Sequence, residues 1–164
     1  MNKEGSQINK AAGHFTKDPA PELVSSGFRM EVNDSVLLYH GMSLADLAHV
    51  IMLIEIDLIP QDARRALLSA LLEMHSLPAE DIDFKIDLVD VYTNRTQMLY
   101  QRTPETAGWL QAGRPRREVS TLAYLIVTRA ELLEVVKYVL KLMETLLEFC
   151  EDHHSTLLPD YTYL

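Results

Sequence analysis

The chain has a single cysteine, Cys150, among its 164 residues, so it cannot form an internal disulfide and is typical of a reducing compartment. It also lacks the apolar amino-terminal run of a signal peptide, and no stretch of about 18 residues is both apolar and uncharged. Basic residues are scarcer than acidic ones, 15 against 24, and the net charge of −9 disfavours binding to nucleic acid or to anionic membranes. These absences predict a cytoplasmic protein with no nucleic-acid or membrane partner.

Motifs for metal and nucleotide chemistry are missing as well. The sequence has no HxxxH or CxxC pair, no glycine-rich phosphate loop and no GxSxG turn around a nucleophilic serine. His153 and His154 are neighbours, so on a helix their side chains point apart. We therefore predict no metal and no cofactor.

Proline and glycine are absent from residues 117–154, and this stretch has the strongest pattern in the chain. Its apolar residues recur mostly three or four positions apart, and a second apolar row flanks the first, which predicts one helix of roughly 55 Å with a wide apolar face. Such a helix needs other long helices, from this chain or from copies of it. The main row consists of Val119, Leu122, Ile126, Leu133, Val136, Leu140, Met143, Leu147 and Cys150.

The amino-terminal part begins with a polar, proline-containing segment, residues 1–22, which we predict to be an extended arm. Residues 23–40 are compatible with a short helix or with irregular chain. From Ser43, which can serve as an N-cap, apolar residues follow at helical spacing until Pro60.

Pro60 opens a second predicted helix, which Leu77 and Pro78 close. The residues after Pro78 alternate briefly between apolar and polar and would permit a strand, whereas residues 88–101 favour a helix. Residues 103–118 predict a loop that leads into the long helix. With 48% apolar and only 7% aromatic residues, the chain as a whole is typical of an aliphatic-rich, all-α protein.

Three arginines, Arg114, Arg116 and Arg117, stand at the start of the long helix. Guanidinium groups beside the free N–H groups of a helix N-terminus can bind the carboxylates of a small acid. A solvated basic turn is the simpler interpretation, and the residues alone favour it.

Six segments in register resemble the amino-terminal part of argininosuccinate lyase, in the aspartase/fumarase superfamily. Single segments are unspecific, but their order and separation extend through the whole chain. They are Lys10–Lys17 (family Gly-Arg-Phe arm), Asp46–His49 with Met52-Leu53 and Leu58-Ile59 (Ser-x-Ala-His, Met-Leu, Gly-Ile), Asp90–Tyr92 (Asp-Val-His), Gly108–Arg114 (Gly-Lys-Leu-His-Thr-Gly-Arg), Arg114–Glu118 (Arg-Ser-Arg-Asn-Asp) and Pro159–Leu164 (Pro-Gly-Tyr-Thr-His-Leu).

Polar site positions differ from that family more than the apolar scaffold does. Arg116 and Thr162 match substrate-binding positions of the family, whereas Tyr163 replaces a histidine that takes part in proton chemistry. Other positions that depart from it are Pro115, Arg117, Gln111, Tyr92, Asp46 and His14, where the family has Ser, Asn, His, His, Ser and Arg.

The resemblance implies a small helical domain followed by the first long helix of a central helix bundle. Its predicted divisions are an arm at 1–22, a helical lyase domain at 23–110, and the incomplete start of the bundle domain at 111–164. In the superfamily, a base removes a proton beside a carboxylate, an amine or hydroxyl leaves, and fumarate forms. Each active site combines three subunits of a homotetramer, and a flexible Gly-Ser-Ser loop with the catalytic serine lies beyond the segment matched here.

We therefore predict the amino-terminal portion of an argininosuccinate lyase-like enzyme of arginine biosynthesis that acts on a dicarboxylate-type substrate and is not active as residues 1–164 alone. The resemblance implies catalytic roles for Thr162 and Tyr163, and substrate binding by Arg114, Arg116, Arg117, Gln111 and Tyr92. The changed site positions favour a substrate other than argininosuccinate. The alternative is a catalytically silent relative that acts as a helical oligomerisation or interaction protein.

Overall fold

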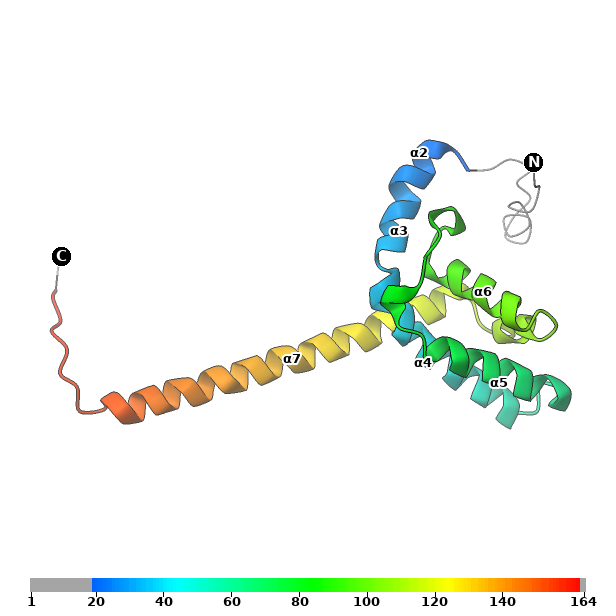
Figure 1. The fold of residues 1–164 in the computed structure, drawn as a ribbon. Helices are drawn as coiled ribbons and strands as arrows, with labels where there is room; N and C mark the ends of the chain where they lie inside the picture. Colours follow the sequence, from blue (N-terminus) through cyan, green and yellow to red (C-terminus); the bar gives the residue numbers. More distant parts are fainter. Residues whose placement is uncertain (1–18, 163–164) are drawn as a thin grey trace. The chain divides into compact units, whose positions relative to one another are not determined.

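The computed structural model describes residues 19–162 of the chain (Figure 1). Helices and short helical turns make up its regular structure, and no strand occurs within this range, so the all-α prediction is confirmed for it. Most of the predicted arm, including His14, and Tyr163 fall outside the described residues.

The chain forms two compact units, residues 1–127 and residues 128–164. The predicted boundary at residues 110 and 111, between a helical lyase domain and a bundle domain, is not tested by these two units and stays a prediction. Within the first unit, residues 116–127 at the start of the last helix belong with the helices before it, since Val119 and Ala123 are buried in their core.

The first unit is helical from Pro21 onward, because α2 (Pro21–Leu23), a π-helical turn η2 (Val24–Phe28) and α3 (Arg29–Asn33) lead directly into α4 (Ser35–Glu55). Proline at the start fits its fixed φ and missing donor. The ambiguity over residues 23–40 is therefore resolved in favour of helix.

The predicted helix start at Ser43 is wrong, because α4 begins eight residues earlier, at Ser35. Ser43 lies within α4, where its side chain is buried and its hydroxyl accepts a hydrogen bond from Arg95. Gly41, which disfavours a helix locally, sits where α4 crosses the start of α7 (Arg116–His153). A Cβ on Gly41 would lie 3.1 Å from the Cα and carbonyl oxygen of Ala123, so a larger residue there would crowd the crossing.

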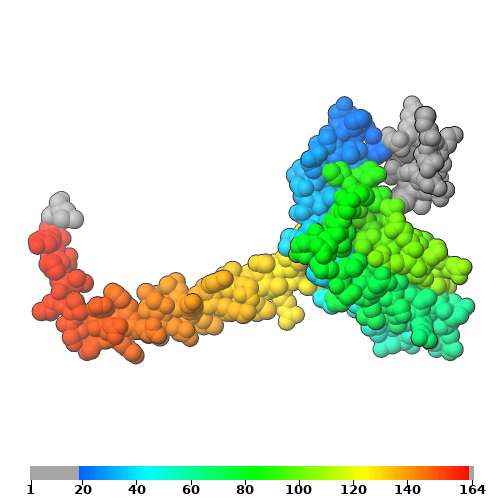
Figure 2. Space-filling model, in the orientation of Figure 1, coloured from blue at the N-terminus to red at the C-terminus, as the bar shows by residue number. Residues whose placement is uncertain are grey.

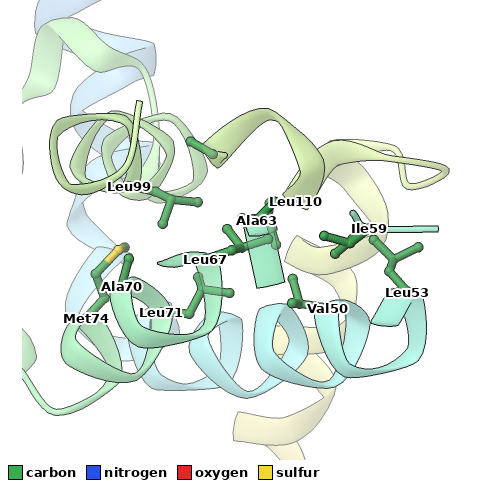
Figure 3. Close-up of a cluster of buried hydrophobic side chains, with 11 residues drawn as sticks. Val50, Leu53, Ile59, Ala63, Leu67, Ala70, Leu71, Met74, Leu99 and Leu110 are labelled. Carbon is green, nitrogen blue, oxygen red and sulfur yellow. The ribbon is translucent and has the colours of Figure 1, made fainter. Parts of the chain in front are cut away.

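The main core lies between α4, α5 (Gln61–His75) and α6 (Val91–Arg102), as Figure 3 shows. The helix predicted after Pro60 is confirmed, with Pro60 as N-cap and Asp62 in the first turn. Spacing of three or four residues places the apolar side chains of α5 on one face, against α4. The buried side chains are Val50, Leu53, Ile59, Ala63, Leu67, Ala70, Leu71, Met74, Leu99, Ala107 and Leu110.

The strand that the sequence permits after Pro78 does not form. Two 3₁₀ turns, η3 (Ala79–Asp81) and η4 (Ile86–Leu88), occupy that stretch. Asn94 of α6 satisfies its backbone instead of a neighbouring strand, because its side chain accepts from the Lys85 N–H at 2.7 Å and donates to the Lys85 carbonyl at 3.0 Å.

The last two helices follow the predicted loop. A 3₁₀ turn, η5 (Ala107–Gln111), precedes α7, and Gly113 has a left-handed φ of 69° in the link between them. The predicted long helix at 117–154 is confirmed to within one residue at each end.

Helix α4 is long and apolar enough to span a membrane by length and composition alone. Half of the qualifying segment is buried inside the first unit, however, and the buried Asp46 at its centre pairs with two arginines. These features are those of a core helix in a folded domain.

Candidate functional site

The three arginines at the start of α7 have different surroundings. Arg114 is a buried structural partner, since its side chain is 6% exposed and its Nη2 donates to Asp46 Oδ1 at 2.6 Å. Its Nη1 also donates to the Ala45 carbonyl at 3.4 Å. Two of the Arg114 N–H groups are therefore directed into α4, away from solvent.

Asp46 holds a second arginine, Arg95 of α6, whose Nη2 donates to Asp46 Oδ2 at 2.9 Å. The Arg95 guanidinium also donates to Ser43 Oγ at 2.8 Å and lies 4.6 Å from the centre of the Tyr39 ring. One carboxylate thus joins α4, α6 and the link to α7. Because all three charged side chains are at most 6% exposed, this network fixes the entry of α7.

Arg116 lies in the first turn of α7 with its side chain 49% exposed. It pairs with Asp90 Oδ2, and its guanidinium carbon lies 5.8 Å from the Tyr92 ring centre. Asp90 is the N-cap of α6, where its other carboxylate oxygen accepts from the Thr93 N–H and hydroxyl, both at 2.8 Å. Asp90 therefore orients Arg116 while the rest of that guanidinium stays open to solvent.

The backbone just before Asp90 is strained. Val89 has φ 72° and ψ −57°, and the Asp90 N–H donates to the Leu88 carbonyl at 2.8 Å. This is a γ-turn with positive φ, which is rare for any residue and unfavourable for a β-branched one. The turn aims Asp90 at both the α6 N-terminus and Arg116.

Of the other predicted site residues, Tyr92 lies beside Arg116. Arg117 and Gln111 are exposed in the first unit. Thr162 is exposed in the second unit, and Tyr163 lies outside the described residues. Tyr92 is half-buried beside Arg116, and burial raises its pKa above the usual value for a phenol.

Two further titratable groups lie near these elements. His49 contacts the Ala112 carbonyl through Nε2 at 3.0 Å, and burial, with the nearby Arg114 charge, lowers the pKa of its imidazole. The Tyr124 hydroxyl donates to Asp34 Oδ2 at 2.7 Å, and this hydrogen bond raises the pKa of Tyr124 to about 12. Tyr124 therefore stays protonated at neutral pH.

The chemistry available here is anion binding. Arg116, Arg117 and the free N–H groups of α7 present positive charge and donors to solvent. Among residues 19–162, no group of three or more His, Cys, Asp or Glu side chains could hold a metal ion.

The roles of Arg95 and Asp46 are not apparent from the sequence. Asp46 stands out there only as a replacement for a family serine, and nothing singles out Arg95. Their pairing joins residues 49 positions apart, so no local spacing reveals it. An acid at the centre of an apolar helix, whose other acidic residue is the terminal Glu55, was the signal available in the sequence.

Comparison with known proteins supports the resemblance. The chain is 29% identical over 160 residues to argininosuccinate lyase of Trichlorobacter lovleyi, which covers 97% of this chain and 34% of that protein. It is 28% identical over 153 residues to argininosuccinate lyase of Ruminiclostridium cellulolyticum, a match that covers 33% of that protein. It is 26% identical over 149 residues to the enzyme of Methanocaldococcus jannaschii, a match that covers 30% of that protein. The chain thus spans about a third of the length of these relatives. No family model and no solved structure matches it.

Proposed function

We propose that these residues act as the amino-terminal portion of an argininosuccinate lyase-like enzyme that releases fumarate from a substituted succinate by β-elimination. Similarity to argininosuccinate lyases along 90–97% of the chain supports the reaction class. The proposed setting is cytoplasmic arginine biosynthesis, in a homotetramer whose sites combine several copies. Each copy contributes α7 to a central bundle.

The observation that carries this proposal is the half-exposed Arg116, oriented by Asp90 and the Tyr92 ring at the first turn of α7. A fixed guanidinium at a helix N-terminus binds a carboxylate by charge-assisted hydrogen bonds. When a base removes the proton beside that carboxylate, negative charge accumulates on its oxygens. Arg116 and Arg117 then stabilise this intermediate electrostatically.

The other residues take distinct roles in this proposal. Tyr92 and Gln111 contact the substrate at the same end of α7. Arg114 does not contact it but holds the link to α7 in place through its ion pair with Asp46. Thr162 and Tyr163 supply the catalytic hydroxyl groups. Tyr163 acts as a hydrogen-bond or proton donor, since an unperturbed phenol with a pKa of about 10 is a poor base at neutral pH.

We further propose that argininosuccinate is not the preferred substrate. Arg117 places a cation where the family has a neutral asparagine, which repels a guanidinium and attracts an additional carboxylate. In the complete enzyme, the double variant Arg117→Asn, Tyr163→His is expected to shift activity towards argininosuccinate. Wild-type turnover of argininosuccinate at the rate of an ordinary lyase would contradict this specificity.

Dicarboxylate binding tests the proposed function on the chain itself. Calorimetric titration with fumarate and succinate should show binding, with acetate as the monocarboxylate control, and Arg116→Ala should weaken it at least about tenfold. Arg129→Ala, which removes an exposed arginine from the second unit, should leave binding unchanged. Equal binding by wild type and Arg116→Ala would remove the main support for a lyase site.

One observation favours the alternative, a catalytically silent relative that acts as an oligomerisation protein. Asp46 and the Ala45 carbonyl each accept a hydrogen bond from Arg114, so two of its donors are directed into the core. This alternative predicts stable oligomers that bind neither fumarate nor succinate.

A further inference from the structure

Residues 85–90 bend sharply without a core of their own. They contain the 3₁₀ turn η4, which has no buried residue, and the strained Val89. Lys85 and Asp87 are exposed, and the segment, drawn green, is visible on the surface of the first unit in Figure 2. Apolar packing therefore contributes little to the conformation of this segment, and hydrogen bonds have to hold it.

Asn94 of α6 holds both ends of the segment. Its Oδ1 accepts from the Lys85 N–H at 2.7 Å, and its Nδ2 donates to the Lys85 carbonyl at 3.0 Å and to the Asp90 carbonyl at 2.9 Å. Both hydrogens of the amide nitrogen are thus used, and Asn94 is only 4% exposed. The buried amide is committed to the backbone of residues 85–90 and is not available to a ligand.

These contacts explain why the turn at Val89 is tolerated. Extended, residues 85–90 would span roughly 17 Å. One amide nitrogen instead holds the Lys85 and Asp90 carbonyls close together, so the chain has to reverse between them. It does so at Val89, where φ is 72°. Strained backbone persists where surrounding contacts over-determine it, and Asn94 supplies those contacts.

The direction of the Asp90 carboxylate depends on this closed loop. Oδ1 of Asp90 accepts from the Thr93 N–H and hydroxyl, and Oδ2 pairs with Arg116. Hydrogen bonds to one carboxylate oxygen do not determine where the other points, because the backbone beneath them can rotate. Here the backbone is fixed, since the N–H and the side-chain Nδ2 of Asn94 both donate to the Asp90 carbonyl, at 3.1 and 2.9 Å.

We propose that Asn94 is a positioning residue for the dicarboxylate site, because it closes residues 85–90 and thereby directs Asp90 Oδ2 at Arg116. Asn94 does not contact the ligand and acts through Asp90. The identity of the ligand in this inference rests on the proposed function. The pairing of Asp90 with Arg116, in contrast, can be measured without any ligand.

The Arg116 side chain reports on this pairing directly. In proton–nitrogen NMR spectra of the chain, its Nε–H resonance is identified by its absence from Arg116→Lys. Asp90→Asn, which removes the partner carboxylate, defines the position of the unpaired resonance. Asn94→Ala should move the resonance of Arg116 towards that position. A resonance that stays at its wild-type position in Asn94→Ala overturns the proposal.

Fumarate titration tests the consequence for binding. Asn94→Ala should weaken fumarate binding about three- to tenfold, as expected when the orientation of one charged contact is lost. In an Asp90→Asn background, Asn94→Ala should cause no further loss of affinity, because its effect passes through Asp90. Additive losses in the double variant would show that Asn94 acts by another route and would contradict the proposal.

Leu99→Ala is the matched control for stability. Leu99 lies on the same helix and is 1% exposed in the main core, so its truncation lowers the free energy of unfolding from a position outside residues 85–90. The Arg116 resonance and the fumarate affinity of the folded protein should stay as in wild type. Equal changes in Leu99→Ala and Asn94→Ala would make Asn94 a general stabilising residue and overturn the proposal.

Asn94→Asp replaces Asn94→Ala if the alanine variant does not fold. Aspartate keeps the shape of the side chain and the acceptor for the Lys85 N–H, but it lacks both donors, so the same changes are expected.

The two measurements separate this inference from the proposed function. If wild type binds no fumarate while the Arg116 resonance moves in Asn94→Ala, the lyase site fails and the positioning role of Asn94 stands. If wild type binds fumarate and Asn94→Ala changes neither the resonance nor the affinity, the positioning role fails.

Discussion

The two compact units of the chain use similar apolar helices in opposite ways. In the first unit, Leu67, Leu71 and Leu99 are at most 1% exposed, and buried ion pairs fix the helices. In the second unit, Leu133 and Leu140 are 53% and 54% exposed, and the one ion pair described there, between Glu134 and Lys137, is on the surface. The first unit thus carries its own core, whereas the large apolar side chains of the second unit are exposed.

Among the proposed variants, Asp46→Asn should have the largest effect on the stability of the first unit. Loss of the carboxylate charge leaves Arg95 and Arg114 buried without a counter-ion, so the free energy of unfolding should fall by about 3–5 kcal/mol. Urea denaturation followed by circular dichroism measures it. Asp57→Asn, which removes the surface partner of Arg64, is the control and should cost at most about 1 kcal/mol. Similar losses for both variants would contradict a special role for the buried network.

Leu67→Ala and Leu140→Ala compare the two units directly. Leu67 is fully buried, so its truncation should lower the free energy of unfolding by about 2–5 kcal/mol at any protein concentration. Leu140→Ala should act only where copies associate, since its cost appears through assembly. Unfolding curves at two protein concentrations measure the difference. A concentration-independent loss for Leu140→Ala would break the distinction between the units.

Gly41→Ala tests the crossing of α4 over the start of α7. Alanine favours a helix by about 1 kcal/mol, but its Cβ would lie 3.1 Å from the Ala123 backbone, and overpacking costs about 1–3 kcal/mol. We expect a net loss of about 1 kcal/mol in thermal denaturation. Gly108→Ala, whose Cβ would meet only the Tyr100 hydroxyl at 3.5 Å, is the control. Stabilisation by Gly41→Ala would show that the two helices can separate at no cost.

The smallest expected effect is a pH dependence from His49. Its folded pKa lies below the unfolded value of about 6.5, so the unfolded state binds more protons as the pH falls below that value. The free energy of unfolding should therefore decrease below about pH 6.5, and His49→Gln should remove part of that decrease. Urea denaturation between neutral and mildly acidic pH measures the slope.

Predictions from the sequence are correct where local signals determine structure. Pro60 and Pro78 flank α5, and the proline-free, glycine-free stretch predicts α7 to within one residue at each end. They are wrong where tertiary contacts decide. Gly41, two residues before the possible N-cap Ser43, favours a helix start there, but α4 begins at Ser35 and Gly41 packs against Ala123.

The candidate site was only partly predictable for the same reason. The first turn of α7 and its arginines were found from composition and from the resemblance. The different roles of Arg114 and Arg116 could not be predicted. They depend on ion pairs with Asp46 and Asp90, which lie 68 and 26 positions away in the sequence. The permitted strand after Pro78 failed because Asn94, rather than a second strand, satisfies the Lys85 backbone.

The strained turn at Val89 has a consequence for directed evolution. Holding a β-branched residue at φ 72° costs on the order of 1–3 kcal/mol, which glycine would largely avoid. A library of Val89 variants selected for heat resistance should therefore be enriched in glycine and asparagine. Selection of the same library for dicarboxylate retention should favour residues that keep Asp90 directed at Arg116, so the two selections should diverge at this single position.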